Sequence, residues 1–425
     1  GVCLNVGCIP SKALLHTAKV ITDAEDTASH GVSFSQPKID LDQLRNWKSN
    51  KVVKKLTMGL AQMAKQREVK VIEGEGKFAS PNQINVKLND GAKKTIGFKS
   101  AIIAAGSQSS EIPNTPDDER IMDSTGALEL KDIPKKLLII GGGIIGLEMG
   151  TVYEALGSEV SVVELSDGLI QGCDRDIVKP LHRRMEKRFE NIWLKTKVTN
   201  IETIKEGVIV YFEGDDAPEK LTFDRVLVAV GRKPNGHKID AEKAGVKVDE
   251  HGFIDVDKQM KTNIDHIYAI GDVIGWPALA SAAYDQGRAA AADITDMEDF
   301  RFVSEVPTGI YTIPEISSVG KNERELTEAK VPYEVGQAFF KNIARAQITH
   351  EGVGMLKILF HRETLELLGV HCFGDQAAEI VHIGQAIMNQ EGEGNTLKYF
   401  VNTTFNYPTM AEAYRIAALN GLNKL

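Results

Sequence analysis

Short apolar runs alternate with helix-like stretches through about the first 275 residues of the chain. Four runs have the length and composition of buried strands: Ala101 to Ala105, Leu137 to Ile140, Val160 to Glu164 and Val226 to Val230. Strands that alternate with helices predict an α/β fold built on parallel sheets. Gly106 follows the first run and Gly231 the fourth, so both turn the chain at a strand end, where open α/β sheets bind ligands.

The pattern changes after about Arg301. Segments 356–360 and 368–373, separated by a turn at 362–367, predict an antiparallel hairpin, and a helix is expected over residues 377–390. This arrangement predicts a separate α+β domain at the C-terminal end of the chain.

Composition and charge limit the classes of partner. The chain has 425 residues, 42% of them hydrophobic, and a net charge of -9. This length predicts two to three domains, and the negative charge disfavours nucleic acid and anionic membranes. No stretch has the apolar length of a membrane span. Four cysteines and no recognisable leader favour a reducing, cytoplasmic compartment.

A cysteine motif opens the chain. Cys3 and Cys8 are five residues apart, and Pro10 stands just inside the start of an apolar-periodic helix. The positive end of a helix lowers the pKa of a nearby thiol, so Cys8 is a candidate thiolate. The pair is close enough for a disulfide of the transient, catalytic kind. The alternative is two unrelated buried cysteines, which Ser11 and Lys12 in the same motif disfavour.

A glycine-rich turn follows the second apolar run. Gly141, Gly143 and Gly146 form the G-x-G-x-x-G pattern, and the next strand ends at Glu164, where an acid binds an adenosine ribose. A glycine-rich connector is the alternative. Glu164 would repel a 2′-phosphate and no Arg follows it as far as Gly168, so we expect NAD and not NADP.

The remaining chemical groups are less specific. Gly271-Asp272 ends another apolar strand, where the aspartate is either a helix cap or a carboxylate for the ribityl chain of a flavin. Cys173 is expected to be a bystander and Cys372 a core residue. The histidines lack metal-ligand spacing, so no metal is expected.

These motifs occur in the order found in the flavoprotein pyridine nucleotide-disulfide oxidoreductases, and residues 1 to about 270 resemble the dihydrolipoamide dehydrogenases. The resemblance implies FAD and NAD as cofactors and a homodimer whose partner supplies a base. It also implies that Cys8 faces the flavin, Cys3 exchanges with dihydrolipoamide on a lipoyl domain of a 2-oxo acid dehydrogenase complex, Lys12 lies beside the flavin, and Asp272 binds the ribityl chain. Gly106, Gly231 and Gly271 belong to the same cofactor motifs.

The resemblance also implies a domain order. Residues 1–130 would form an FAD-binding domain without its opening βαβ unit, 131–252 an NAD-binding domain, 253–303 a return to the central domain, and 304–425 a dimerisation domain. The fold class is therefore two Rossmann-like dinucleotide-binding domains plus an α+β dimerisation domain. The family's first glycine-rich turn would lie roughly thirty to forty residues before Gly1, so either the chain is a fragment of a longer gene product or its FAD binding is badly compromised.

The C-terminal third departs from the dehydrogenases. Tyr407-Pro408 stands where they carry His-Pro, with Glu412 at the position of the paired acid. From about Gly271 the chain is more similar to the soluble pyridine nucleotide transhydrogenases, a sister family. We expect dihydrolipoamide oxidation by NAD, with Cys3, Cys8, Tyr407 and Glu412 at the catalytic positions. The alternatives are hydride exchange between NADPH and NAD through FAD, and an inactive NAD-binding fragment.

Overall fold

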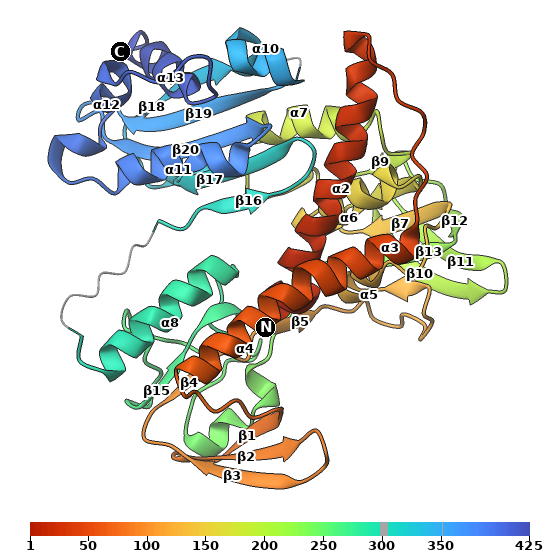
Figure 1. The fold of residues 1–425 in the computed structure, drawn as a ribbon, viewed down its shortest axis with the longest axis vertical. Helices are drawn as coiled ribbons and strands as arrows, with labels where there is room; N and C mark the ends of the chain where they lie inside the picture. Colours follow the sequence, from red (N-terminus) through yellow and green to blue (C-terminus); the bar gives the residue numbers. More distant parts are fainter. Residues whose placement is uncertain (298–304, 351) are drawn as a thin grey trace. The chain divides into compact units, whose positions relative to one another are not determined.

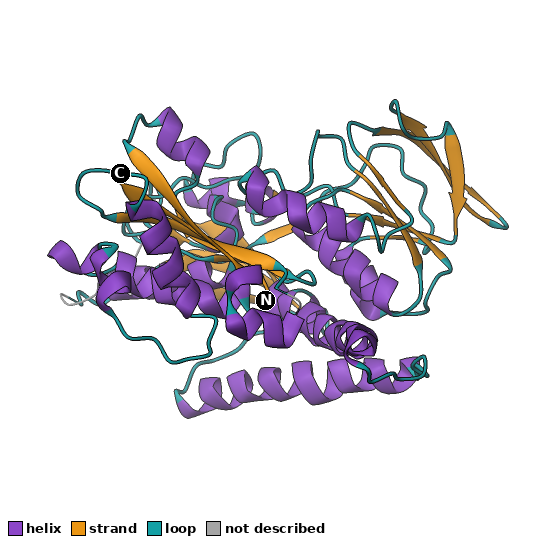
Figure 2. Ribbon diagram, turned by 90° about the horizontal axis from the view of Figure 1, so that it is seen from above, coloured by secondary structure: helices purple, strands orange, loops and turns teal. Residues whose placement is uncertain are grey.

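The computed structural model describes residues 1–297, 305–350 and 352–425 (Figure 1). They form two compact units. Unit 1 comprises Gly1–Pro10, Asn46–Glu111 and Val230–Ser304, and unit 2 comprises Ser11–Arg45, Ile112–Ala229 and Glu305–Leu425. Within the units, strands gather into sheets with helices against them, as Figure 2 shows. The four domain ranges expected from the sequence stay a prediction, and the boundary expected near residue 301 lies outside the described residues.

Unit 1 is built from small sheets around two apolar clusters, one containing Phe78 and Ile267 and the other Met260 and Tyr268. Its antiparallel sheet contains β1 (Gly74–Ser80), β2 (Gln83–Leu88) and β3 (Lys93–Gly97). The strand β4 (Ala101–Ile103) pairs in parallel with β15 (Ile267–Ala269), and β5 (Ser107–Ser109) pairs antiparallel with β14 (Arg232–Pro234). Its main helices are α1 (Val2–Val6), α4 (Lys54–Gln66) and α8 (Ala280–Ile294). The β5–β14 pairing brings together the strands that follow Gly106 and Gly231.

Unit 2 contains the parallel sheet that the sequence predicts. Its strand order is β6 (Ile121–Met122), β13 (Arg225–Val228), β7 (Lys136–Ile140), β8 (Glu159–Val163) and β9 (Asn191–Trp193), all parallel. The apolar residues of β7 are buried, as expected for a central strand covered on both faces. Helices α5 (Ser124–Glu129), α6 (Ile144–Ala155) and α7 (Arg175–Met185) belong to this layer, next to an antiparallel sheet of β10 (Lys197–Ile204), β11 (Gly207–Glu213) and β12 (Lys220–Phe223).

The C-terminal part of unit 2 is a five-stranded antiparallel sheet. Its order is β16 (Thr308–Ile310), β17 (Glu315–Gly320), β20 (Leu367–Gly374), β19 (Gly354–His361) and β18 (Tyr333–Phe339). The β19–β20 hairpin, with Leu356 opposite Cys372, and α11 (Ala377–Met388) confirm the elements predicted there. Helix α11 packs on β17 and β20 and α13 (Glu412–Leu422) on β18 and β19, while α9 (Glu323–Glu328), α10 (Ala344–His350) and α12 (Lys398–Asn402) are shorter (Figure 1).

Alternate residues of β19 point into two different environments. Leu356, Ile358 and Phe360 join the core under α11 and α13, which also contains Tyr414. Lys357, between them, forms ion pairs with residues at the start of α7 and α9. The remaining helices are the long α2 (Cys8–Asp26) and the short α3 (Leu41–Asn46). Among the described residues, no helix is long and apolar enough to cross a membrane.

Candidate functional site

The cysteine pair occupies the junction of two helices in unit 1. Cys3 lies in α1, Cys8 is the first residue of α2, and a disulfide joins them, with their Cα atoms 4.5 Å apart. Cys8 is thus within the first turn of a helix, where unpaired backbone N–H groups favour a thiolate after reduction. This geometry is suited to a disulfide that is reversibly reduced and reoxidised.

Further along α2, Lys12 is held in unit 2 by a buried acid. Its Nζ lies 2.7 Å from Glu148 Oε2, and the Glu148 side chain is only 4% exposed. The other carboxylate oxygen of Glu148 accepts a hydrogen bond from the backbone N–H of Tyr311 at 3.0 Å. Lys12 Nζ also lies 4.6 Å from the centre of the Tyr311 ring. Sequence reasoning missed Glu148, although a lone carboxylate in the apolar segment 144–150 was a signal for a buried ion pair.

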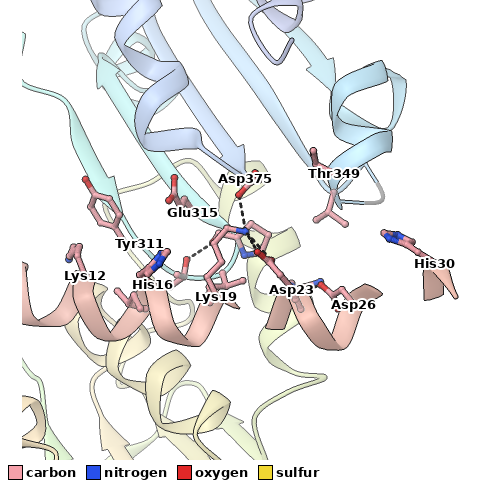
Figure 3. Close-up of a pocket in the computed structure, with 16 residues that line it drawn as sticks. Lys12, His16, Lys19, Asp23, Asp26, His30, Tyr311, Glu315, Thr349 and Asp375 are labelled. Atoms are coloured by element: carbon pink, nitrogen blue, oxygen red, sulfur yellow. Dashed lines mark hydrogen bonds and ion pairs between the residues drawn. The ribbon is translucent and has the colours of Figure 1, made fainter. Parts of the chain in front are cut away.

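A cavity of about 260 Å³ opens along the same face of α2 (Figure 3). Lys12, His16 and Lys19 project into it from the helix, opposite Tyr311 and Glu315. Burial alone would lower the pKa of Lys19, but its ion pairs with Asp23 and Asp375 outweigh burial and raise that pKa. Burial is also the main cause that raises the pKa of Tyr311 and of Glu315. The cavity therefore extends from the Lys12 position along a wall of mixed charge.

The glycine-rich turn of unit 2 has the geometry of a dinucleotide site. A β-carbon on Gly146 would lie 2.2 Å from the carbonyl oxygen of Gly141, so no side chain fits there. Gly143 caps the N-terminus of α6, and a β-carbon built on it would have open space around it. Backbone N–H groups at a helix N-terminus bind phosphate, so the turn fits the pyrophosphate of NAD.

Glu164 follows β8 and turns toward this glycine-rich segment. Its Oε2 accepts a hydrogen bond from Gly142 N at 2.7 Å, and its Oε1 accepts one from Ser166 N at 2.7 Å. The Ser166 hydroxyl donates a third hydrogen bond to Oε1. Three hydrogen-bond donors therefore stabilise the carboxylate of Glu164, which the sequence argument for NAD over NADP treated as having no partner.

A second polar cluster lies in unit 1, where the β5 and β14 strands meet. Asp272 accepts a hydrogen bond from the Ser107 hydroxyl, and the same hydroxyl accepts one from Arg232 Nε at 2.7 Å. Asn235 donates to the Ala105 carbonyl at 2.9 Å, and its Oδ1 is buried without a hydrogen-bond partner among the described residues. An unsatisfied buried acceptor beside a carboxylate suits a hydroxyl-bearing ligand such as the ribityl chain of FAD.

Three glycines surround this cluster, and each needs a backbone that favours glycine. Gly106, Gly231 and Gly271 have φ of 65°, 120° and 73°. The structure thus brings together three glycine turns that lie far apart in the sequence, among them Gly271-Asp272, which was less specific when taken alone.

Tyr407 and Glu412 do not form a hydrogen-bonded cluster with each other in the described part of the chain. The Tyr407 side chain is 68% exposed, and its phenol has no hydrogen-bond partner in the described part of the chain. Glu412 is the first residue of α13. Cys173 is partly buried, and burial raises the pKa of its thiol to about 11, while Cys372 is buried in β20. Neither thiol has the exposed, electropositive surroundings of a reactive cysteine.

Family models and relatives agree with this geometry. The model described as pyridine nucleotide-disulphide oxidoreductase matches residues 1–287, and the dimerisation domain of that family matches residues 306–418. A soluble pyridine nucleotide transhydrogenase from Marinobacter nauticus is 48% identical over 435 aligned residues, which cover 100% of this chain and 91% of the relative. The proteins of that name from Pseudomonas savastanoi and Pseudomonas aeruginosa are 47% and 46% identical with the same coverage.

Solved structures share the fold. The HOCl-induced flavoprotein disulfide reductase RclA from Escherichia coli has a TM-score of 0.85 and 27% identity, covering 99% of this chain and 91% of its own. LpdA from Mycobacterium tuberculosis has a TM-score of 0.89 over 99% of this chain and 91% of its own. At 23% identity, the second likeness shows the fold alone. The predicted fold class, two Rossmann-like domains and a dimerisation domain, is confirmed.

The comparisons correct the predicted activity. Dihydrolipoamide oxidation, and with it the assignment as dihydrolipoyl dehydrogenase, is wrong, because the full-length relatives at 46–48% identity carry the transhydrogenase name. The sequence argument gave the Cys3–Cys8 pair and Glu164 more weight than the C-terminal third. A lipoyl domain partner has no support without that activity. The predicted cofactors FAD and NAD are confirmed as those of the family.

Proposed function

This chain belongs to the pyridine nucleotide-disulphide oxidoreductase family, and we propose that it exchanges hydride between NADPH and NAD through FAD. The observation that carries the proposal is the identity of 46–48% to soluble pyridine nucleotide transhydrogenases across the whole chain. The alternative drawn from Tyr407 and the C-terminal third of the sequence thus becomes the main hypothesis.

Bound FAD would supply a carrier that takes up two electrons as hydride and gives them back. The chain's own residues would bind and orient the flavin and the nicotinamide nucleotides. The turn at Gly141, Gly143 and Gly146 would hold the pyrophosphate of the nicotinamide nucleotide, with Glu164 on the adenosine ribose. Asp272 would hold the ribityl chain, and the ion pair with Glu148 would fix the ammonium of Lys12 for the flavin.

Hydride exchange needs neither a thiol nor a general base. Cys3, Cys8, Tyr407 and Glu412 therefore carry no step of the proposed reaction. The exposed phenol of Tyr407 is consistent with this, because a catalytic proton donor is normally held by a partner. The relatives' name supports an enzyme that acts in the cytoplasm, and the matched dimerisation domain supports a homodimer. Sedimentation of the purified protein tests the dimer.

The test follows hydride transfer from NADPH to the NAD analogue thio-NAD, measured by absorbance with FAD-loaded protein. We expect turnover in the wild type and an unchanged rate in Cys3→Ser and in Cys8→Ser. Gly146→Ala should abolish exchange, because its β-carbon would collide with the Gly141 carbonyl at 2.2 Å. Gly59→Ala is the matched control, since nothing lies within 4 Å of a β-carbon there. Flavin-loaded protein that transfers no hydride to thio-NAD would refute the proposal.

A further inference from the structure

The proposed exchange requires one feature that the sequence did not supply, a cation for the 2′-phosphate of NADPH. In dinucleotide folds an arginine near the ribose-binding position receives that phosphate. The loop directly after Glu164, residues 165–168, contains none. The following inference rests on the proposed function and identifies where this chain places the cation.

Arg175, the first residue of α7, turns its side chain back along the loop that follows β8. Its Nη1 donates to the Leu169 carbonyl at 2.8 Å, its Nη2 to the carbonyls of Ile170 and Cys173, and its Nε to Cys173. Four of the five guanidinium N–H groups are thereby used. The fifth, on Nη1, has no acceptor among the described residues. The guanidinium is therefore fixed in position with one donor left over.

The remaining donor faces Gly168. A β-carbon built on Gly168 would lie 2.8 Å from Arg175 Nη1, so only glycine leaves this side of the guanidinium uncovered. Gly168 is half-buried, whereas Arg175 is exposed to solvent. An incoming anion can therefore reach the guanidinium from the solvent side of Arg175.

The charge of Arg175 is not cancelled by its neighbours in sequence. Asp174 and Asp176 both direct their carboxylates to Lys357, at 2.8 and 2.7 Å from its Nζ. No ion pair joins Arg175 to an acid in the part of the chain that the structure describes. Backbone carbonyls orient the guanidinium but carry no net charge, so its full positive charge remains available.

This guanidinium belongs to the same network as the ribose-binding acid. Ile170, whose carbonyl receives Nη2, donates its N–H to the Gly142 carbonyl at 3.1 Å. Gly142 in turn donates its own N–H to Glu164. The Leu169 side chain also packs at Gly142, where a β-carbon would lie 2.5 Å from it. Arg175 is thus tied, through two backbone contacts, to the residue expected to hold the adenosine ribose.

We propose that Arg175 is the specificity-determining residue for the 2′-phosphate of NADPH in this chain. Hydrogen bonds from the Gly142 and Ser166 N–H groups hold the Glu164 carboxylate in place, and Arg175 supplies the attraction for the 2′-phosphate. Asp167 opposes it from the same loop, because its carboxylate receives only a long 3.5 Å contact from Gln171. The site then tolerates both NADPH and NAD, as an enzyme that exchanges hydride between them requires.

The test measures binding by calorimetry, with 2′,5′-ADP as the probe that carries the 2′-phosphate and 5′-AMP as the probe without it. Arg175→Gln should weaken 2′,5′-ADP at least about tenfold, since a hydrogen bond to a charged group contributes that much, and leave 5′-AMP within about twofold. Arg183→Gln is the matched control. It removes an exposed arginine that forms no ion pair with the described residues, about 12 Å further along the same helix, and should change neither affinity.

Asp167→Asn should change the affinity in the opposite direction, which misfolding could not cause. It should strengthen the binding of 2′,5′-ADP about threefold or more and leave the affinity for 5′-AMP unchanged. Equal weakening of both probes by Arg175→Gln, or no change in either, would overturn the assignment. The proposed function fails separately. If 2′,5′-ADP binds in an Arg175-dependent manner but the wild type passes no hydride from NADPH to thio-NAD, the exchange is wrong and the phosphate site stands. If the wild type exchanges hydride but Arg175→Gln does not change the affinity for NADPH, the proposed function stands and the assignment of Arg175 is wrong.

Discussion

Lys357 offers the sharpest test of how the C-terminal sheet is joined to the dinucleotide fold. It is fully buried in β19, and its ammonium lies 2.8, 2.7 and 2.6 Å from Asp174, Asp176 and Glu323. Each N–H of the ammonium therefore has one carboxylate. We predict that Lys357→Met strongly destabilises unit 2, because methionine keeps the apolar stem but leaves three acids together.

The magnitude follows from the burial of the partners. Removing one member of a buried ion pair costs about 3–5 kcal/mol, because the remaining charge is left uncompensated. Only the Asp174 side chain is well buried here, at 9% exposed, whereas Asp176 and Glu323 are 38% and 37% exposed. Solvent screens the exposed pair, so the expected loss is at the lower end, about 3 kcal/mol. Asp176→Asn alone should cost about 1 kcal/mol.

Urea unfolding monitored by tryptophan emission measures this loss, because Trp193 is the buried tryptophan of unit 2. Lys179 is exposed on α7 and forms no ion pair within the part of the chain that the structure describes, so Lys179→Met is the control and should stay within about 0.5 kcal/mol of wild type. A loss below about 1 kcal/mol for Lys357→Met would refute the reasoning, since it would mean that the three carboxylates are solvated without the lysine.

The pH dependence has a definite sign. Burial would lower the pKa of Lys357, but hydrogen bonds to Asp174, Asp176 and Glu323 outweigh it and raise that pKa above its ordinary value. A raised lysine pKa contributes stability that is complete below the unfolded value of about 10.4 and is lost as pH rises through the folded value. The stability difference between wild type and Lys357→Met should therefore be flat from pH 7 to 9.

Three further predictions concern other contacts. Asp132→Asn should lower the free energy of unfolding by about 1 kcal/mol at pH 7, because the hydrogen bonds from Arg225 hold the pKa of Asp132 below its usual range; urea titrations should show this contribution above pH 4 and its loss as pH falls through the folded pKa. Glu148→Gln should reduce FAD retention or the rate of hydride exchange, measured by flavin absorbance and by the thio-NAD assay, because Lys12 loses its buried counter-charge; unchanged values would show that Lys12 needs no anchor. Tyr407→Phe should leave hydride exchange within about twofold of wild type, and a tenfold loss would return the phenol to the reaction.

The sequence predicted the elements that depend on local pattern. Buried strands such as β7 and β8, and the β19–β20 hairpin, have the periodicity and composition from which they were inferred. The glycine-rich turn and its acid were found for the same reason, since their spacing is fixed by one βαβ unit. The sequence did not predict contacts between segments that are far apart along the chain. The Lys12–Glu148 pair spans 136 positions, and nothing local in either segment identifies the other.

The chemistry near Glu164 shows why a charge count along the chain could not decide cofactor selectivity. The sequence places one arginine between two aspartates, Asp174 and Asp176, so these three residues together have a net negative charge. Folding separates them, because the buried Lys357 takes both carboxylates and needs them for its own stability. Arg175 is left to the loop carbonyls, which align it without neutralising it. The same fold gives Glu164 three hydrogen-bond donors. The acid expected to repel a 2′-phosphate is held by hydrogen bonds, and Arg175 forms no ion pair with the two aspartates beside it, so the electrostatic preference of the site depends on partners that only the tertiary structure supplies.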